Sequence, residues 1–538
     1  MLDTHGMSED DERSPKHDEA VLETPKKAGP VVTVLVPTFN RRRYLAGALA
    51  SVVHQGYRNL QIIVINDGGE DVSDIVNSFG DERLIFIDRK ENRGKAFSLN
   101  EALARAEGKY VAYLDDDDLY YTNHIETLVN ALENESNCQV AYSDLYKVYC
   151  KVCLDGSKQV LSKVVEFCRD FDRFVILYFN QTVHQSLMHR RDLIEKTGPY
   201  NEDLNILIDW DMTRRLAFFS DFYHAHRITG EFYRPVGKSD RISVRGRKDK
   251  SEYLKNFLKI RTTRPAKPWT KLGDMSIIFI TDHLNKQAGA TLGSIWQHTF
   301  YPYEIYLPLP AANFERLDSK MPNIIPVPVN ALSSHDQRID AALAKCEGEY
   351  IAIVPNGFPI REFWIEDSLH ALVNGPVSCE GFELEASTDT LWAALVRKEK
   401  LQYARRSFSN LPVRQSLKAA GIVLRQPAFE ERPFQFDNLF HEAQFAEKNG
   451  NWAQAAQIFE YIAEHHQNEL WMKALAAKAF FNASGYTRAA KLSCEVNQQW
   501  PTVDTLLVEA KVNREKKDFN SAIESLNRAE QILEGKEL

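Results

Sequence analysis

The chain has 538 residues, of which 44% are hydrophobic and 26% charged, and its formal net charge is −9. This composition excludes a fibrous or disordered protein, and at roughly 150 residues per domain it predicts about three or four domains. No apolar run reaches the roughly 18 residues of a membrane-spanning helix, the acidic balance argues against nucleic-acid binding, and the seven cysteines favour a reducing compartment; we expect a cytoplasmic protein with at most peripheral membrane contact.

The N-terminal half predicts an α/β domain. Residues 1–28 are polar and lack the apolar stretch of a signal peptide, so we predict a disordered leader. Beyond it, apolar runs typical of buried strands alternate with helical patterns. The predicted strands are 31–36, 60–65, 84–88 and 110–114, and the predicted helices are 44–54 and 94–106. Strands that alternate with helices predict a doubly wound sheet.

An internal repeat indicates a second domain of the same kind. Residues 102–110, ALARAEGKY, return at 342–350 as ALAKCEGEY. We therefore predict two tandem α/β domains of related fold, at 29–264 and 271–430, joined by a linker around 265–268.

The last part of the chain has a different pattern. After about residue 434 the sequence is rich in Ala, Glu and Gln, and the aromatic positions Trp452, Tyr486 and Phe519 recur at the spacing of about 34 residues that is typical of tetratricopeptide repeats. Residues 434–538 thus predict helical repeats, with a plain helical bundle as the alternative. Repeats of this kind offer an extended surface, which suits a polypeptide partner or a homodimer.

Three short motifs follow three of the predicted strands at the point where each strand ends. Pro37, Thr38 and Phe39 follow the first strand, Asp67 the second, and four adjacent aspartates at 115–118 the fourth. The carboxyl ends of parallel strands meet at one edge of such a sheet, where ligands bind. Adjacent carboxylates repel one another unless a cation relieves them. Hard oxygen ligands predict Mg²⁺ or Mn²⁺ held together with a diphosphate. The alternative is that the aspartates are exposed to solvent where the next helix begins.

The order and spacing of these motifs resemble the family 2 inverting glycosyltransferases, which have the GT-A fold. The resemblance covers roughly residues 31–250. Its motifs are Val36-Pro37-Thr38-Phe39-Asn40, Asn66-Asp67-Gly68, Glu91-Asn92-Arg93-Gly94, Tyr113-Leu114-Asp115-Asp116-Asp117-Asp118 and Ile208-Asp209-Trp210-Asp211. It implies a nucleotide-sugar donor, and Asp67 favours a UDP-sugar.

The resemblance also implies roles for single residues. The residues that it places at the nucleotide sugar are Pro37, Thr38, Phe39, Asp67, Arg93, Lys95, Asp115 and Asp116. Within this set Asp67 would bind the nucleobase and Asp116 the ribose, while Asp117 would hold the metal.

Asp209 is the catalytic base that the resemblance implies, although Ile208 stands where the family has Glu. A carboxylate can take the proton of an acceptor as it attacks the anomeric carbon, and a single displacement then inverts the configuration. The alternative for Asp209 and Asp211 is helix capping and dipole complementarity.

Three further patterns bear on the site. Lys238 and Arg241 predict either a phosphate lid or an exposed basic linker. His224 and His226 predict either an extra metal ligand or a polar edge strand. Residues 146–165 predict a β-hairpin.

The second α/β domain has lost the acidic motifs of the first. Pro310 stands in the position of Asp67, and Pro355, Asn356 and Gly357 stand in the positions of the aspartates. A metal and nucleotide site needs such carboxylates, so we predict a degenerate domain that serves structure or acceptor binding.

We therefore expect an inverting, metal-dependent glycosyltransferase of the hexosyltransferase type, acting on a protein, a peptide or a surface glycan. One alternative is a nucleotidyltransferase of related fold, which would need a Gly-rich phosphate loop, and no glycine lies between Val31 and Ala46. The other is a non-catalytic scaffold built on the repeats, which the intact aspartates disfavour.

Overall fold

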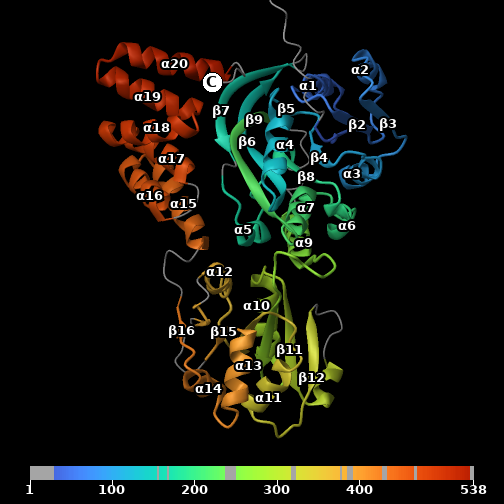
Figure 1. Ribbon diagram of the computed structural model, residues 1–538, viewed down its shortest axis with the longest axis vertical. Helices are drawn as coiled ribbons and strands as arrows, with labels where there is room; N and C mark the ends of the chain where they lie inside the picture. The colour runs from blue at the N-terminus through green and yellow to red at the C-terminus, as the bar shows by residue number, and fades with distance from the viewer. Residues whose placement is uncertain are drawn as a thin grey trace, which may run out of the picture.

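The computed structural model describes residues 29–153, 157–166, 169–236, 250–316, 323–375, 378–384, 392–426, 433–465 and 469–533. Figure 1 shows an α/β region at the upper right, a second α/β region below it and an array of helices at the left. The predicted leader at 1–28 and the predicted lid residues Lys238 and Arg241 lie outside the described residues. Within the described ranges, no helix has both the length and the apolar character that crossing a membrane requires.

The first α/β region is built on a sheet with the strand order β3-β2-β1-β4-β8-β6-β9-β5, in which β7 pairs with β6. Its strands are β1 (Val32–Thr38), β2 (Leu60–Asn66), β3 (Leu84–Asp88), β4 (Tyr110–Tyr113), β5 (Leu119–Tyr120), β6 (Cys138–Val152), β7 (Lys158–Glu166), β8 (Leu187–Arg190) and β9 (Asp221–Pro235). Its helices are α1 (Arg42–Val53), α2 (Ser73–Ser78), α3 (Lys95–Ala104), α4 (His124–Asn134), α5 (Arg173–Tyr178), α6 (Leu193–Thr197), α7 (Ile208–Leu216) and α9 (Lys250–Thr262), with a short 3₁₀ turn at His184–Ser186.

Helices cover both faces of this sheet. Leu35 packs in the cluster that contains α3, whereas Val34 and Val36 pack in the cluster that contains α1 and α4. Successive side chains of a strand point to opposite faces, so a largely apolar strand such as β1 is buried on both sides. The predicted α/β sheet and its first four strands are confirmed, and the predicted hairpin is formed by the antiparallel strands β6 and β7.

The second α/β region has a sheet with the strand order β12-β11-β10-β13-β15-β14-β16. Its strands are β10 (Met275–Ile280), β11 (Tyr303–Leu309), β12 (Ile324–Pro328), β13 (Tyr350–Pro355), β14 (Gly381–Glu383), β15 (Ala394–Arg397) and β16 (Leu424–Arg425). Its helices are α10 (Lys286–His298), α11 (His335–Leu343), α12 (Glu366–Asn374), α13 (Lys398–Ser407) and α14 (Val413–Ala419), with a 3₁₀ segment at Ala311–Arg316.

The two sheets share one pattern of pairing. β1 pairs parallel with β2 and β4, and β10 pairs parallel with β11 and β13. The next pairs are antiparallel in both sheets, β4 with β8 and β8 with β6 in the first, β13 with β15 and β15 with β14 in the second. A parallel pair then follows, β6 with β9 and β14 with β16. Each strand from β10 to β16 thus has a counterpart in the first sheet.

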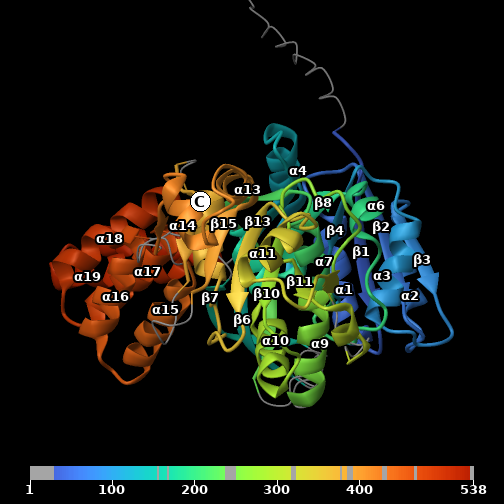
Figure 2. The same cartoon turned by 90° about the horizontal axis from the view of Figure 1, so that it is seen from below.

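The C-terminal helices form consecutive, mutually packed elements. They are α15 (Pro433–Lys448), α16 (Trp452–His465), α17 (Glu469–Asn482), α18 (Tyr486–Gln499), α19 (Val503–Glu515) and α20 (Phe519–Leu533). Small residues such as Ala455, Ala456 and Ala476 are buried where these helices meet. Figures 1 and 2 both place the helical array on the side of β6 and β7, away from β3.

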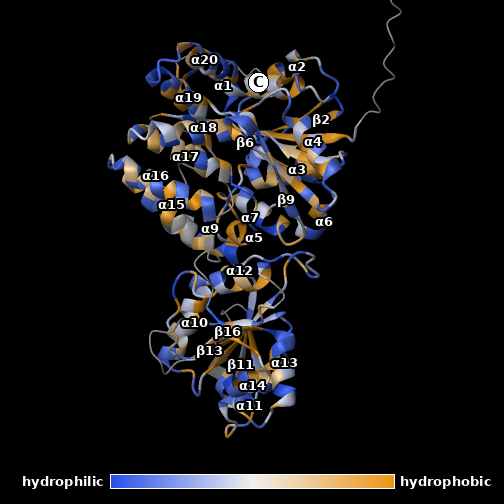
Figure 3. Cartoon of the chain, turned by 60° about the vertical axis from the view of Figure 1, so that its left-hand side comes forward, coloured by the Kyte–Doolittle hydropathy of each residue, from blue (hydrophilic) through white to orange (hydrophobic). Residues whose placement is uncertain are grey.

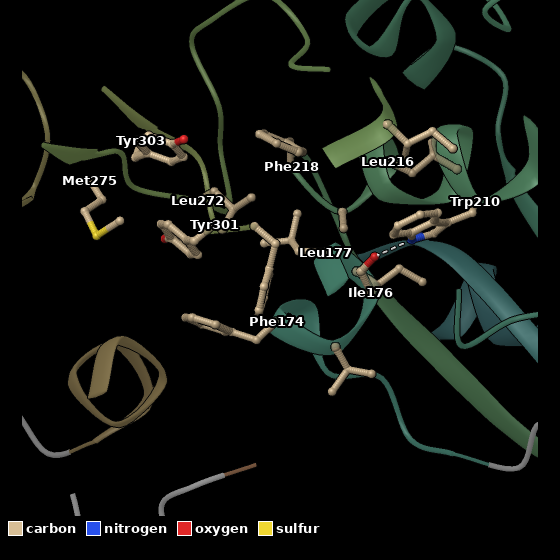
Figure 4. Packing of buried hydrophobic residues seen from close by; sticks show 14 of the residues in the cluster. Phe174, Ile176, Leu177, Trp210, Leu216, Phe218, Leu272, Met275, Tyr301 and Tyr303 are labelled. Atoms are coloured by element: carbon tan, nitrogen blue, oxygen red, sulfur yellow. Dashed lines mark hydrogen bonds between the residues drawn. The ribbon is translucent and has the colours of Figure 1, made fainter. Parts of the chain in front are cut away.

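One apolar cluster joins the two α/β regions. It contains Phe174 and Leu177 of α5, Leu216 of α7, and Met275 and Tyr301 of the second region (Figure 4). In Figure 3 hydrophobic residues gather in the interior of both α/β regions, and the outer faces of the helices are more hydrophilic. Because the shared cluster includes residues of α7, packing against the second region stabilises the position of the helix on which Asp209 lies.

Candidate active site

The four aspartates at 115–118 form a tight turn at the carboxyl edge of the first sheet. Leu114 continues the ladder of β4 by donating from its N–H to Leu35 O at 3.0 Å, and the N–H of Asp118 donates to Asp115 O at 3.2 Å. Asp115, Asp117 and Asp118 each place a carboxylate oxygen within 4.8 Å of the others. Three hard oxygen donors this close are a fitting set for Mg²⁺ or Mn²⁺. Asp118 was not among the predicted site residues.

Asp116 lies beside this set and is held by the end of β1. Its Oδ2 accepts from Thr38 Oγ1 at 2.7 Å. Arg41 Nη1 lies 3.2 Å from Asp116 Oδ1 and 3.0 Å from Asp117 Oδ2, so one guanidinium joins both carboxylates. Burial raises the pKa of Asp116 above its ordinary value, and Arg41 opposes that rise. The predicted residue Thr38 thus holds Asp116 in place, while Pro37 is half-buried and Phe39 is exposed at the same edge.

Asp67 is buried at the end of β2 and fixes the turn that opens α3. Its Oδ1 accepts from the N–H of Arg93 at 2.9 Å and from Arg89 Nη1 at 2.8 Å, and its Oδ2 accepts from the N–H of Gly94 at 2.8 Å. The chain passes so close at Gly68, where φ is 69°, that a Cβ there would overlap the backbone of Glu91. The glycine is therefore required by both its conformation and the close approach.

Two arginines stack on one aromatic ring beside Asp67. The Arg93 guanidinium lies 3.4 Å and that of Arg89 4.4 Å from the centroid of the Phe97 ring. Arg93 was a predicted nucleotide contact, and its exposed side chain leaves it available for an anion. Arg89 and Phe97 were missed, because only the fold brings the end of β3 and the first turn of α3 to Asp67.

Lys95 lies between the aspartates and the predicted base. Its Nζ is 2.5 Å from Asp115 Oδ1. Burial acts to lower the pKa of Lys95, but Asp115, Asp209 and Asp116 outweigh that effect and the pKa is raised. Lys95 therefore stays protonated and supplies a positive charge at the point where carboxylates converge.

Asp209 lies in the first turn of α7 and is half-buried. Asn180 Nδ2 donates to its Oδ2 at 2.9 Å. Burial raises the pKa of Asp209, and Lys95 counteracts this rise. Leu207, two residues before Asp209, has φ 62°, a left-handed conformation that is strained for a bulky residue and often marks a functional site. Asn180 was missed, since nothing in the sequence around it predicts contact with Asp209.

The surroundings of Asp209 are fixed by the rest of α7. Trp210 Nε1 donates to Ile176 O at 2.8 Å (Figure 4). Asp211 pairs with Arg215 at 2.6 Å, and both side chains are buried. Asp211 therefore has a structural partner, whereas Asp209 faces Lys95 and Asn180.

The hairpin of β6 and β7 borders the aspartates and contacts the helical array. Lys158 Nζ donates to Asp117 O at 2.5 Å, and the N–H of Tyr233 on β9 donates to Asp118 Oδ1 at 2.8 Å. Val503 of α19 packs with Tyr146 in a small buried cluster. The array is thus attached to the strands that border the acidic turn.

The corresponding edge of the second sheet lacks such a group. Pro310 follows β11, and Asn356 and Gly357 follow β13. Asp282, which follows β10, is paired with Arg338 at 3.1 Å. Among the described residues of this region, no three carboxylate or histidine side chains are grouped closely enough to hold a metal.

Comparisons with known proteins match the part of the chain that contains Asp67 and the acidic turn. Residues 33–151 match the model of Glycosyl transferase family 2. An uncharacterised glycosyltransferase of Rickettsia typhi is 31% identical over 209 residues, which are 37% of this chain and 62% of that protein. The chain thus spans about three fifths of that relative's length. Glycosyltransferase GlyA of Streptococcus pneumoniae is 35% identical over 118 residues, 21% of this chain and 17% of that protein.

Among solved structures, the mannosyltransferase PcManGT from Pyrobaculum calidifontis in complex with GDP-Man and Mn²⁺ has a TM-score of 0.32 and 18% identity, covering 44% of this chain and 66% of that chain. The N-terminal part of the chain therefore carries a segment that matches glycosyl transferase family 2, and its relatives are named as glycosyltransferases.

Proposed function

We propose that this chain is an inverting, metal-dependent glycosyltransferase of the hexosyltransferase type, which takes a sugar from a nucleotide sugar, with a UDP-sugar favoured. The observation that carries the proposal is the grouping of Asp115, Asp117 and Asp118 at the carboxyl edge of the sheet, next to a separate carboxylate, Asp209, that Asn180 holds. The group of three carboxylates can bind a cation, and the carboxylate of Asp209 can accept a proton.

The metal that this proposal implies fits the residues present. Asp117, with Asp115 and Asp118, would hold Mn²⁺ or Mg²⁺, because all three offer only hard oxygen donors. When bound, such a cation neutralises the charge that develops on a departing diphosphate. Lys95 and Arg93 add fixed positive charge for the same phosphates, and preorganised charges of this kind stabilise a transition state without reorganisation.

The nucleotide would lie along the edge formed by β1, β2 and the start of α3. Pro37, Thr38 and Phe39 form one side of it and Asp67 the other. Asp67 would offer carboxylate acceptors to a base with an imide N–H, while Asp116, next to Thr38, would bind the ribose.

Asp209 would act as the base. Its carboxylate takes the proton of the acceptor as the acceptor oxygen or nitrogen attacks the anomeric carbon, and the bond to the diphosphate breaks in the same displacement. Burial raises the pKa of Asp209, which improves a carboxylate as a proton acceptor near neutral pH. Attack from the face opposite to the leaving group inverts the anomeric configuration.

The other two regions would serve the acceptor in a cytoplasmic enzyme. The shared strand order supports a degenerate GT-A-like domain at 271–430, and the successive helix pairs support tetratricopeptide-like repeats at 434–538. Because α19 packs on the hairpin whose Lys158 touches the acidic turn, a polypeptide held by the repeats would be presented close to Asp117. We therefore favour a protein or peptide acceptor over a surface glycan, with a homodimer through the repeats as the remaining use of this surface.

A screen of nucleotide sugars for metal-dependent hydrolysis tests the proposal without an acceptor. We expect one donor to be hydrolysed with Mn²⁺ or Mg²⁺, and the activity to be lost with chelator and in Asp117→Asn. Asp192→Asn is the matched control, because Asp192 is exposed and pairs with Arg190 away from the site. Hydrolysis that is unchanged in Asp117→Asn would overturn the proposed metal site.

A further inference from the structure

A second group of metal-binding side chains lies in the middle of β9. His224 and His226 of this strand face Asp144 of β6 and Asp170, which lies shortly before α5; we name these four residues the histidine cluster. His224 Nε2 is 2.8 Å from Asp144 Oδ1, and its Nδ1 is 2.8 Å from Asp170 Oδ1. His226 Nε2 is 3.0 Å from the same oxygen of Asp170.

The pairing of β6 with β9 explains why these side chains meet. Tyr142 is opposite His224, but Asp144 is opposite Ile228, so the strands shift register between them. Residues two apart on a strand point to the same face of the sheet, and the rings of His224 and His226 lie with their centroids 4.0 Å apart. The ring of Tyr142 stacks on that of His224, with centroids 4.6 Å apart and planes 6° apart, which fixes the imidazole.

The histidine cluster is separate from the acidic turn. The N–H of Tyr233 on the same strand reaches Asp118, and Tyr233 follows His226 by seven residues (233 − 226). At a rise of about 3.3 Å per residue, that separation is roughly 23 Å along the strand. No residue is shared between the two groups of potential metal ligands.

Asp144 gives an independent sign that a ligand belongs here. Its side chain is fully buried, and among the described residues its Oδ2 has no hydrogen-bond partner. A buried carboxylate oxygen without a partner is costly. Asp144, His224 and His226 each have a ligand atom within 4.8 Å of the others, so one cation can engage all three.

The geometry points to a binding site for one divalent cation of the zinc type in the histidine cluster, held by His224, His226 and Asp144 with Asp170. Two imidazole nitrogens and carboxylate oxygens are the ligands of Zn²⁺ and Co²⁺, whereas the all-oxygen acidic turn suits Mg²⁺ and Mn²⁺. The two sites of this chain are thus distinguished by the chemistry of their ligands.

The cation would fix the segment that reaches the proposed base. Asp170 begins this segment, Gln181 Nε2 donates back to Asp170 O at 3.3 Å, and the neighbouring Asn180 holds Asp209. Anchoring Asp170 to β6 and β9 therefore holds the segment of Asn180 in place. This consequence rests on the proposed function, but the binding of the cation does not.

The test measures metal binding to the full-length, metal-stripped chain. With Co²⁺ as the probe, we expect visible absorption bands of a nitrogen-ligated site, and with Zn²⁺, calorimetry should give one tight site per chain. Both signals should persist in Asp117→Asn, which alters only the acidic turn. In His226→Ala and Asp144→Asn, the Zn²⁺ affinity should fall by at least about 10-fold.

The variants are chosen so that each outcome shows whether the cation binds at the histidine cluster. His226 is 46% exposed in its side chain, so its loss leaves the core intact even where Asp144→Asn fails to fold. His54→Ala is the matched control, because His54 is an exposed histidine whose Nδ1 lies 2.8 Å from Ala50 O of the helix before it. If the wild-type protein shows no Co²⁺ bands, no cation binds at the histidine cluster. If His226→Ala and the wild type bind Zn²⁺ with equal affinity, the cation binds elsewhere. Either result overturns the inference.

Discussion

Burial and Lys95 have the largest effects on the pKa of the proposed base, and replacing Asn180 by alanine would remove a further contribution, the hydrogen bond that Asn180 donates. Asn180 Nδ2 donates to Asp209 Oδ2 at 2.9 Å. A hydrogen bond to a charged group contributes about 1.5–3 kcal/mol, and half-burial favours the lower end of this range because solvent screens the charge. One pKa unit corresponds to about 1.36 kcal/mol. Because the bond stabilises the charged form, Asn180→Ala should raise the pKa of Asp209 by about one unit.

The assay is the pH dependence of kcat/KM for donor hydrolysis, in which water takes the place of the acceptor. Asp209 must be deprotonated to accept a proton, so a higher pKa moves the acidic limb of the profile to higher pH. In Asn180→Ala we expect the acidic limb to shift upward by about one pH unit. At pH values above the shifted limb, kcat/KM should return to its plateau. The control is Asn205→Ala, because Asn205 lies just before α7 but bonds Asn256 at 2.8 Å. An equal loss of rate at every pH, without a shift of the limb, would refute the assignment of Asp209.

Three more predictions follow from the same geometry. Asp209→Asn should lower kcat by about 10²–10⁴ with the donor KM little changed, and a mutant with normal kcat but weak donor binding would instead place Asp209 in the nucleotide pocket. Gly68→Ala should lower the free energy of unfolding by about 1–3 kcal/mol, which calorimetry would detect as a lower Tm. The control is Gly80→Ala, which should lower the Tm less, because φ is also positive there but nothing lies within 4 Å of the added Cβ. Equal Tm values for the two variants would show that the close approach at Gly68 does not matter. Deleting residues 449–538 should preserve donor hydrolysis but impair transfer to the acceptor or break a homodimer, provided that circular dichroism shows a folded fragment. The deletion keeps α15, because Phe434 stacks on the second α/β region. Full transfer in an unchanged oligomeric state would show that the repeats do not bind the acceptor.

The sequence predicted the parts of the fold that depend on local pattern. The largely apolar segments at Val32–Thr38 and Leu60–Asn66 are strands buried on both faces, and strands of this type leave a nearly continuous hydrophobic signal. The position of Asp67 and the acidic turn at the same edge of the sheet could also be predicted, because β2 and β4 both run parallel to β1 and the carboxyl ends of parallel strands lie at one edge.

The partners of the site residues could not be predicted in the same way. Asn180 is 29 residues from Asp209, and Arg41 is 75 residues from Asp116, so only tertiary packing brings them together. The turn at 115–118 also decides which carboxylates converge: Asp116 turns to Thr38, and Asp118 joins Asp115 and Asp117. Four identical adjacent residues carry no pattern from which that choice could be read.

The second α/β region has the strand order of the first sheet, but its described residues contain no acidic turn of the same kind. Its strands retain the order of the first sheet, because buried apolar strands and their covering helices determine the pairing. Asn356 and Gly357 follow β13, in the place of the aspartates. Asp282, after β10, forms an ion pair with Arg338. Packing therefore accounts for this region, whereas the candidate chemistry lies in the first.

The central claim is a single displacement at the anomeric carbon with Asp209 as the base. The measurement that tests it most directly is proton NMR of the sugar released from the hydrolysed donor, recorded faster than the anomers interconvert. The account predicts that the first anomer to appear has the configuration opposite to that of the donor, and that Asp209→Asn suppresses its formation while Asp211→Asn, provided that it folds, does not abolish it. A first product with the donor's own configuration would contradict the account, because retention requires two displacements and a different role for Asp209.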